Sequence, residues 1–564
     1  MHARVCPFLP VALAAALLAA SASCGDGSDR PERDDVGAVD VPVADPGAGE
    51  DADADAGSPE PGGLPDDGED GTGDPGDAKE DDGGTGAPDA ADVGATVRDR
   101  VGDTDLLIVT TAALRAPFDE LAAWKTRKGI PARVWTMEEV RAGAPGVPDD
   151  ATALREALRE AAAGGTQWVL LGGRPPLVPV RKVHCQAYNA AEDATLDADV
   201  IADLYFADLD GDWDADGDGV YGEPGDGLGD MAPELWVGRV PAASAAEAQA
   251  YVDKVMAYER RPVAGYQATA VLMGEVAASM QGMVLCSTTV FESSIADRFP
   301  DDFSVTKMYD PACGDFPDAV LNSDAAQLQL WQAGDRHIVV HLGHGNLETL
   351  GRIDPVDCRD RIPATTRPAV FLTCQCDSCM FDQGDRAGCE YFLTDPWGGV
   401  IYMGNTDFGV GFPWETLFYD ALLADLFADP GTSVGQRFAD TLATYGDDSG
   451  GDLDAPDSDF RWTRFTLHLM ADPSLVIWTT VPVQAEAGVV RDEAGGAWSV
   501  RVTAGGQPVG GATVALHWSG AHLFVARTGM DGVARFAWGA QGVPGAGGAL
   551  TVTGATIVPI ERDL

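Results

Sequence analysis

Basic residues are scarce in this chain of 564 residues: 37 Lys and Arg stand against 90 Asp and Glu, and the formal net charge is −53. Proteins bind nucleic acid and anionic membrane surfaces largely by neutralising phosphates with cations. We therefore expect no nucleic-acid partner and no electrostatic attraction to a lipid surface. The length is sufficient for two or three domains with full-sized cores.

Long apolar runs are also missing, except near the N-terminus. There Arg4 precedes the apolar run 11–20, and the small residues 21–23 follow it. This pattern predicts an export signal over 1–24 rather than a membrane span, because the run is too short to cross a bilayer. Cys24 stands where the small residues end, as in bacterial lipoprotein signals, although Ser21 replaces the usual Leu. We expect an exported protein that is either lipid-anchored at Cys24 on a bacterial cell surface or fully secreted.

Aromatic residues are absent from 25–101, a segment made mainly of Asp, Glu, Gly, Pro and Ala. Such a segment cannot bury enough apolar surface to offset the entropy lost on ordering. We predict a disordered acidic linker over these residues. A pro-segment is the alternative that composition leaves open.

Strand and helix patterns alternate after this linker. Strands are predicted at 105–111, 132–136 and 168–172, with helices at 116–128 and 151–163. The order strand–helix–strand–helix–strand predicts a parallel sheet with helices on its faces, forming a first unit over 102–262. Gly172 and Gly173 follow the third strand, but neither GxGxxG nor GxxxxGK[ST] is present, so we expect no organic cofactor.

The same alternation returns from 263 to 479 and predicts a second α/β unit. Its predicted strands include 337–342, which ends just before His344, and 369–373, which ends just before a group of cysteines. In open α/β sheets the functional site lies at the carboxyl ends of the strands. An imidazole beside a thiol is the arrangement that a cysteine nucleophile needs, because the thiolate is the attacking species.

The cysteines allow a second interpretation. Cys374, Cys376, Cys379 and Cys389 are closely spaced, as in zinc sites, but the first two would lie on a strand rather than in a zinc-binding turn. Export favours disulfides instead, and we expect pairing within the set Cys358, Cys379 and Cys389. The connectivity cannot be deduced from the sequence.

An acidic loop within 196–239 predicts a structural calcium site. Its carboxylates fit the pattern D-x-D-x-D-G-x5-E, in which alternate oxygens converge on one Ca²⁺. The candidate ligands are Asp212, Asp214, Asp216, Asp218 and Glu223. No amphipathic helix precedes the loop, so it is not a complete EF-hand, and a solvated acidic loop is the alternative.

From 480 to 564 the pattern changes to short alternating runs separated by glycine-rich turns, which predicts a small β-sandwich. The run TGMDGVARF at 528–536 resembles the Ig-like modules that follow exported enzymes. No His, Cys or carboxylate cluster suited to catalysis occurs here, so we expect binding, spacing or stabilisation as its role.

The ordered motifs LLIVTT, WVLLGG, ELWVGRV, HLGHGN, CDSCMFD and LHLMADPSLVIW span 106–478. Together they resemble the gingipain family of cysteine peptidases, which belongs to the caspase-like clan. The resemblance implies a caspase-like sandwich of two parallel-sheet units with helices on the faces. It also implies an exported cysteine endopeptidase that acts on protein or peptide substrates.

Carried onto this sequence, the family motifs make His344 the catalytic imidazole and Cys376 the nucleophile. The spacing to Phe381 selects Cys376 over Cys374, although Cys379 occupies the usual glycine position. The resemblance also implies that the backbone N–H groups of Gly345 and Cys376 form the oxyanion hole.

A carboxylate that orients the histidine is a further feature of the family. The candidates are Asp203 and Asp199, and the resemblance also allows Asp203 to line a specificity pocket for Arg or Lys. The rival hypothesis is a catalytically silent, calcium-stabilised binding protein of the cell surface, in which Cys379 distorts the turn at the nucleophile.

Overall fold

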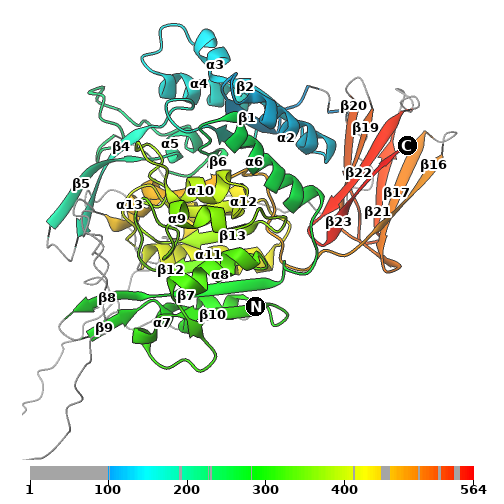
Figure 1. Ribbon diagram of the computed structural model, residues 1–564. Helices are drawn as coiled ribbons and strands as arrows, with labels where there is room; N and C mark the ends of the chain where they lie inside the picture. Colours follow the sequence, from blue (N-terminus) through cyan, green and yellow to red (C-terminus); the bar gives the residue numbers. More distant parts are fainter. Residues whose placement is uncertain are drawn as a thin grey trace, which may run out of the picture. The chain divides into compact units, whose positions relative to one another are not determined.

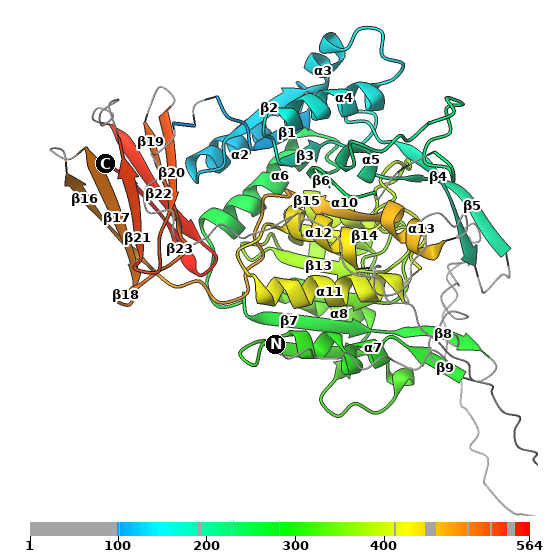
Figure 2. The ribbon, with the colours of Figure 1, turned by 180° about the vertical axis from the view of Figure 1, so that it is seen from behind.

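The computed structural model describes residues 99–100, 102–189, 194–226, 228, 231–280, 283–410, 413–445, 458–492, 496–518, 522–538 and 547–564. The predicted export signal and all of the predicted acidic linker except residues 99–100 lie outside this part of the chain. Within it, no helix is both long and apolar enough to cross a membrane. Figures 1 and 2 show the arrangement from opposite sides.

The first α/β unit contains a four-stranded parallel sheet in the order β2-β1-β3-β6. Its strands are β1 (Leu106–Thr110), β2 (Ala132–Thr136), β3 (Trp168–Gly172) and β6 (Trp236–Val240). Its helices are α2 (Arg115–Arg127), α3 (Met137–Gly143), α4 (Asp150–Ala163), α5 (Leu204–Ala207) and α6 (Ala245–Val255), which continues into η1 (Met256–Arg260). The predicted strands and helices of this unit are confirmed.

Local signals explain where these helices begin. Asp149 caps α4 by accepting a hydrogen bond from Thr152 N at 2.8 Å, and Gly164 ends this helix. Helix α3, which was not predicted from the sequence, starts with a capping box between Thr136 and Glu139. This helix is short, and its apolar pattern alone is too brief to identify it.

The second α/β unit contains a seven-stranded sheet in the order β11-β10-β7-β12-β13-β14-β15. The strands are β7 (Thr269–Gly274), β10 (Ser304–Tyr309), β11 (Val320–Leu321), β12 (Ile338–Leu342), β13 (Ala369–Thr373), β14 (Gly399–Asn405) and β15 (Leu467–Ala471). All neighbours pair in parallel except β14 and β15, which are antiparallel. The expectation of purely parallel sheets therefore needs correction at this edge, where mixed sheets often carry an antiparallel strand.

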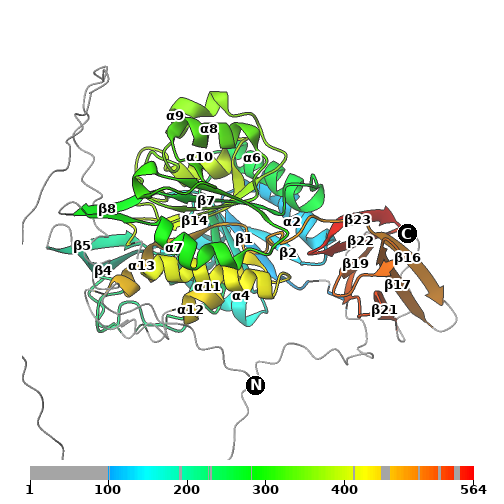
Figure 3. The same cartoon turned by 90° about the horizontal axis from the view of Figure 1, so that it is seen from below.

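Helices cover both faces of this sheet (Figure 3). On one side lie α8 (Asp324–Ala333), α9 (Pro355–Cys358) and α10 (Gly388–Thr394), and on the other lie α7 (Thr288–Ser293), α11 (Trp414–Ala428) and α12 (Val434–Thr444). The remaining short elements are η2 (Ile295–Arg298), η3 (Pro311–Cys313), η4 (Arg359–Arg361) and α13 (Asp459–Thr466). The central strands β12 and β13 are buried at every position, as their runs of apolar and β-branched residues predict.

Two β-hairpins extend from the carboxyl-end side of the sheets and were not predicted. They are β4 (Lys182–Asn189) with β5 (Ala194–Ile201), and β8 (Val276–Met280) with β9 (Met283–Cys286). Only Glu275 separates β7 from β8, so this hairpin starts directly at the carboxyl end of a core strand. A disulfide between Cys286 and Cys313 links β9 to η3.

Buried charges join the two α/β units. Lys125 of α2 is fully buried, and its Nζ lies 2.8 Å from both Glu259 Oε2 and Asp472 Oδ2. Glu259 belongs to the first unit and Asp472 follows β15 of the second. Burial alone would raise the pKa of Glu259, but Lys125 and Lys128 outweigh it and lower this pKa to about 2. Lys125 therefore links Glu259 of the first unit to Asp472 of the second at the junction.

Residues 486–563 form two four-stranded antiparallel sheets with a separate apolar core. One sheet contains β16 (Glu486–Asp492), β17 (Ala497–Ala504), β18 (Gln507–Pro508) and β21 (Val533–Ala537); the other contains β19 (Thr513–Trp518), β20 (His522–Arg527), β22 (Gly548–Gly554) and β23 (Ile557–Asp563). Glu561 of β23 pairs with Arg127 at 3.0 Å and with Arg260 at 2.6 Å, which connects this region to the first unit. Its assignment to the Ig-like class remains a prediction.

Candidate active site

His344 and Cys376 lie beyond the carboxyl ends of two adjacent parallel strands. The register of β12 and β13 pairs His341 with Thr373, and each candidate follows its paired residue by three positions. The backbone bond from Cys374 N to His341 O, at 3.3 Å, continues the pairing just past the strands. Both residues therefore emerge at the same edge of the sheet.

Cys376 is 6 % exposed, and its Sγ lies 3.9 Å from Gly409 O. The sulfur is held in a disulfide bond in this structure. The thiolate that the predicted chemistry requires is therefore released only when this bond is reduced.

The backbone reverses sharply after Cys376. Asp377 has a φ of 57°, a left-handed conformation that is unusual for a residue with a Cβ. The turn is held by hydrogen bonds from Asp377 N to Asp407 O at 2.9 Å and from Cys379 N to Asn405 O at 2.8 Å. A residue in the strained conformation requires such support from its surroundings, and here it comes from the end of β14 and the residues just after it.

Cys379 and Cys389 are both fully buried free thiols. Cys358 is also a free thiol, so the predicted disulfides within this set are absent. The candidate metal groups in the described part of the chain consist of carboxylates alone, so none of them supports the zinc hypothesis.

Cys374 occupies an unsuitable environment for a nucleophile. Its Sγ lies 3.9 Å from His341 O, and burial raises the pKa of this thiol, with a further contribution from the negative charge of Glu415. A thiol with a raised pKa contains little thiolate at neutral pH.

The His344 side chain is exposed, and its Nε2 lies 3.1 Å from Val276 O in the β8–β9 hairpin. A carbonyl oxygen can only accept, so Nε2 carries the proton in this contact. Nδ1 is then the basic nitrogen when the ring is neutral. The backbone N of His344 donates to Glu275 Oε2 at 3.2 Å.

Glu275 is the carboxylate that contacts His344, and the sequence analysis missed it. This side chain is buried and also accepts hydrogen bonds from Arg352 Nε at 2.7 Å and Asn322 Nδ2 at 3.3 Å. Burial would raise its pKa, but His341, whose Nε2 lies 3.6 Å from Oε1, and Arg352 lower the pKa to about 2. Glu275 lies 69 residues before His344, and no local pattern marks it.

The glycines on either side of His344 have distinct packing reasons. A Cβ at Gly343 would collide with the Glu275 carboxylate, and one at Gly345 would lie 2.6 Å from Gln375 Nε2. Larger residues would therefore displace the loop that carries His344. The predicted oxyanion role of the Gly345 and Cys376 N–H groups stays a prediction.

Asp203 and Asp199 do not contact His344. Both Asp203 oxygens bind Arg239, at 2.7 Å to Nε and 2.8 Å to Nη2, and Asp203 N donates to His468 Nε2 at 3.0 Å. Asp199 instead lies 3.7 Å from His184 Nδ1 in the β4–β5 hairpin. The structure therefore corrects both predicted roles of Asp203, because its charge is already neutralised inside the protein.

The acidic loop brings its carboxylates together. Oxygens of Asp214, Asp216 and Asp218 lie within 4.8 Å of one another, and those of Asp216, Glu223 and Asp226 form an overlapping group. Asp212 accepts from Asp214 N at 3.4 Å, at the start of the loop.

A third carboxylate group, absent from the sequence analysis, contains Asp208, Asp210 and Glu234. Asp208 is fully buried, and burial raises its pKa to about 6. Its spacing from Glu234 is too long for a local motif, which explains why the group was missed.

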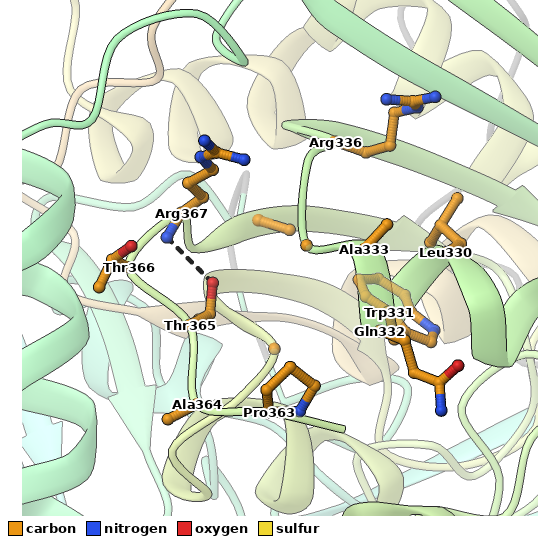
Figure 4. Close-up of a pocket in the computed structure, with 13 residues that line it drawn as sticks. Leu330, Trp331, Gln332, Ala333, Arg336, Pro363, Ala364, Thr365, Thr366 and Arg367 are labelled. Carbon is orange, nitrogen blue, oxygen red and sulfur yellow. Dashed lines mark hydrogen bonds between the residues drawn. The ribbon is translucent and has the colours of Figure 1, made fainter. Parts of the chain in front are cut away.

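A pocket of about 170 Å³ lies near the amino ends of β12 and β13 in the second sheet. Trp331, Arg336, Thr365 and Arg367 line it, and Figure 4 shows the hydrogen bond from Arg367 N to Thr365 Oγ1. Arg336 and Arg367 precede β12 and β13, whereas His344 and Cys376 follow them. This pocket is therefore separate from the candidate active site.

The model of peptidase family C25 matches residues 100–478. The fold also matches a solved complex of the Porphyromonas gingivalis RgpB pro- and mature domains, with a TM-score of 0.62 and 14 % identity over 81 % of this chain and 99 % of that chain. The crystal structure of the Arg-specific cysteine proteinase gingipain R matches with a TM-score of 0.62 and 14 % identity, over 82 % of this chain and 97 % of the other. No curated protein sequence matches.

The low pKa of Glu275 has a measurable consequence. A carboxyl whose folded pKa is about 2, against an ordinary value of 4.5, stabilises the fold above pH 4.5 and loses this contribution as the pH falls toward 2. We expect Glu275→Gln to lower the free energy of unfolding by about 3 kcal/mol at pH 7. Urea unfolding at a series of pH values should show the difference from wild type shrinking below pH 4.5; a difference independent of pH would contradict this account.

Proposed function

The chain belongs to peptidase family C25 and is a cysteine-type peptidase, and we propose that it cleaves internal peptide bonds with Cys376 as nucleophile and His344 as general acid and base. The register of β12 and β13, which brings both residues to one sheet edge, is the observation that carries this proposal. The Cys376 thiolate attacks the scissile carbonyl, and His344 protonates the leaving amine. Water then hydrolyses the thioester.

The surroundings of His344 and Cys376 support these roles. Glu275 holds the backbone of the His344 loop, so the imidazole stays at the sheet edge without a direct ion pair to its ring. The N–H groups of Gly345 and Cys376 are proposed to stabilise the oxyanion, since glycine at 345 leaves room for the substrate carbonyl.

Reduction is a condition of this activity. An external thiolate attacks the Cys376 disulfide, forms a mixed disulfide with one sulfur and releases the other as thiolate; a second thiolate completes the exchange. We expect wild-type protein to cleave reporter peptides in dithiothreitol, and Cys376→Ala to lose at least about 10³-fold in kcat/KM.

Cys374→Ala is the matched control, because the Cys374 thiol lies two residues before Cys376 in the sequence but has a raised pKa. This variant should retain kcat/KM within about 3-fold, as expected for a thiol outside the chemistry. Loss of activity only in Cys374→Ala would reverse the assignment. No cleavage by reduced wild type in the presence of calcium would favour the silent binding protein with Cys379 in the glycine position.

Arg or Lys before the cleaved bond is proposed as the preferred substrate feature. Asp203 is occupied by Arg239, so the support comes from Asp377 and Asp407, two partly exposed carboxyls beside the nucleophile. Burial raises the pKa of Asp377 to about 6, and the charge of Asp407 adds to this effect. A cationic substrate side chain would relieve this repulsion between carboxylates.

We compare reporter peptides that carry Arg, Lys or Ala immediately before the cleaved bond. At pH 8 we expect kcat/KM for the Arg and Lys reporters to exceed that for the Ala reporter by about 10–100-fold, as charge-assisted hydrogen bonds allow. The preference should decrease below pH 6, where Asp377 becomes protonated and loses its charge. Asp377→Asn should reduce the preference at pH 8, and Glu156→Gln, an exposed change on α4, should not. Equal cleavage of the Arg and Ala reporters would refute this specificity.

Structural calcium is proposed for the acidic loop, where Asp214, Asp216 and Asp218 converge. Unneutralised carboxylates at these distances repel one another, and Ca²⁺ favours such oxygen ligands. We expect saturating Ca²⁺ to raise the Tm by about 5–10 °C over EGTA-treated protein. Asp216→Asn should reduce this shift while Glu156→Gln leaves it unchanged; an identical Tm with and without Ca²⁺ would count against the site.

Export to the bacterial cell surface, with a lipid on Cys24 or as a secreted protein, is proposed from the predicted signal over 1–24. Detergent phase partitioning of the exported protein, compared with Cys24→Ala, distinguishes a lipid anchor from a soluble product.

The C-terminal β-sandwich is proposed to be an Ig-like module with a binding or spacing role, supported by its two antiparallel sheets and separate core.

A further inference from the structure

The turn that follows the nucleophile is bound from outside by the first α/β unit. We define the nucleophile turn as residues 376–383. Arg174, which directly follows β3 and its two glycines, donates from Nη2 to Phe381 O at 3.1 Å and to Gln383 O at 2.6 Å. These bonds connect residues more than 200 positions apart in the sequence.

Gly172 and Gly173 allow the close packing that positions Arg174, and they are not part of a nucleotide-binding motif. A Cβ at Gly172 would lie 2.6 Å from the Phe118 ring, and one at Gly173 would lie 2.9 Å from Val178 Cγ2. Close packing therefore accounts for both glycines. The Arg174 backbone is fixed in turn by a bond from its N to Ala242 O at 3.1 Å.

Glu390 completes the contact on the other side of the guanidinium. Arg174 Nη1 lies 3.5 Å from Glu390 Oε1, and Glu390 Oε2 accepts from Ala387 N at 2.7 Å at the start of α10. The carboxylate is almost fully buried, whereas Arg174 is 15 % exposed. One guanidinium thus joins the nucleophile turn to the helix packed behind it.

Two other cations of the first unit contact the same short stretch. Lys182 Nζ lies 2.9 Å from Asp382 Oδ2, and the Arg239 guanidinium lies 5.2 Å from the centre of the Phe381 ring. Lys182 is half exposed, so its pair contributes little, whereas Arg239 is fully buried. Arg174 and these two cations of the first unit therefore all contact residues 381–383.

We propose that Arg174 is a positioning residue for Cys376, which holds the nucleophile turn by binding the carbonyls of Phe381 and Gln383 and the carboxylate of Glu390. This inference rests on the proposed function of Cys376. The turn is strained at Asp377 and is held on its other side by backbone hydrogen bonds to Asp407 and to the end of β14, and by one from α10 to Ser378 O. Without Arg174, the far end of the turn loses two hydrogen bonds and its link to Glu390 of α10, and the sulfur moves relative to His344. A displacement of about 1 Å can lower a rate by about 10²-fold.

The test compares Arg174→Met, Arg174→Lys and Arg159→Met in the full chain under reducing conditions. Arg159 is the matched control, because it belongs to the same unit and also donates to a backbone carbonyl, that of Leu209, far from the nucleophile turn. We expect Arg174→Met to lower kcat about 10–100-fold with KM changed less than about 3-fold. Arg174→Lys should recover part of kcat, since an ammonium can still donate to one carbonyl.

The rate of Cys376 alkylation by iodoacetamide, followed by mass spectrometry after reduction, provides a second readout. It should change at least about 5-fold in Arg174→Met and remain at the wild-type value in Arg159→Met, and it does not require turnover. The inference is overturned if Arg174→Met keeps both kcat and the alkylation rate within about 2-fold of wild type, or if Arg159→Met lowers kcat equally. Wild-type protein that fails to cleave any reporter refutes the proposed function, while the alkylation rates still decide the role of Arg174.

Discussion

The parallel register of β12 and β13 is the constraint on which the site depends. Side chains beyond the ends of two hydrogen-bonded parallel strands emerge at the same sheet edge, and the buried apolar runs of both strands fix this register. The position of His344 relative to Cys376 therefore follows from the pairing of these two strands in the sheet.

Several of the scarce cations of this acidic protein lie inside it or bind its active-site loops. Lys125 and Arg239 are fully buried, and each is bound by carboxylates; Arg352 pairs with Glu275 beneath the His344 loop, and Arg174 binds the nucleophile turn. A buried charge is tolerated only when its partners compensate the lost hydration. These pairs thus restrict how the two α/β units and the loops at the active site can be arranged.

The predictions made from the sequence agree best with the structure where the signal lies in neighbouring residues. The strands around β1 and β13 and the helix that begins after Asp149 follow from periodicity and capping, and the sequence motifs correctly indicated peptidase family C25. Agreement fails where partners are distant. Glu275, Arg174 and the antiparallel edge strand β15 depend on contacts across many residues, and no local pattern reports them.

Candidate carboxylates illustrate the same limit. Asp203 belongs to a motif of the family, yet its neighbour in space is Arg239 on β6, which neutralises it. The cysteines are similar: their number and the predicted export implied disulfides, but the observed bond between Cys286 and Cys313 depends on how the β8–β9 hairpin meets η3.

The sequence by itself determined the family, the succession of α/β units and the strand ends that carry His344 and Cys376, because apolar periodicity and short motifs are written in neighbouring residues. The tertiary structure alone decided which charges face one another: Glu275 at the His344 loop, Asp203 with Arg239, and Arg174 on the nucleophile turn. Electrostatic and hydrogen-bond partners are chosen by distance in space, and chain folding sets that distance only after every element has packed.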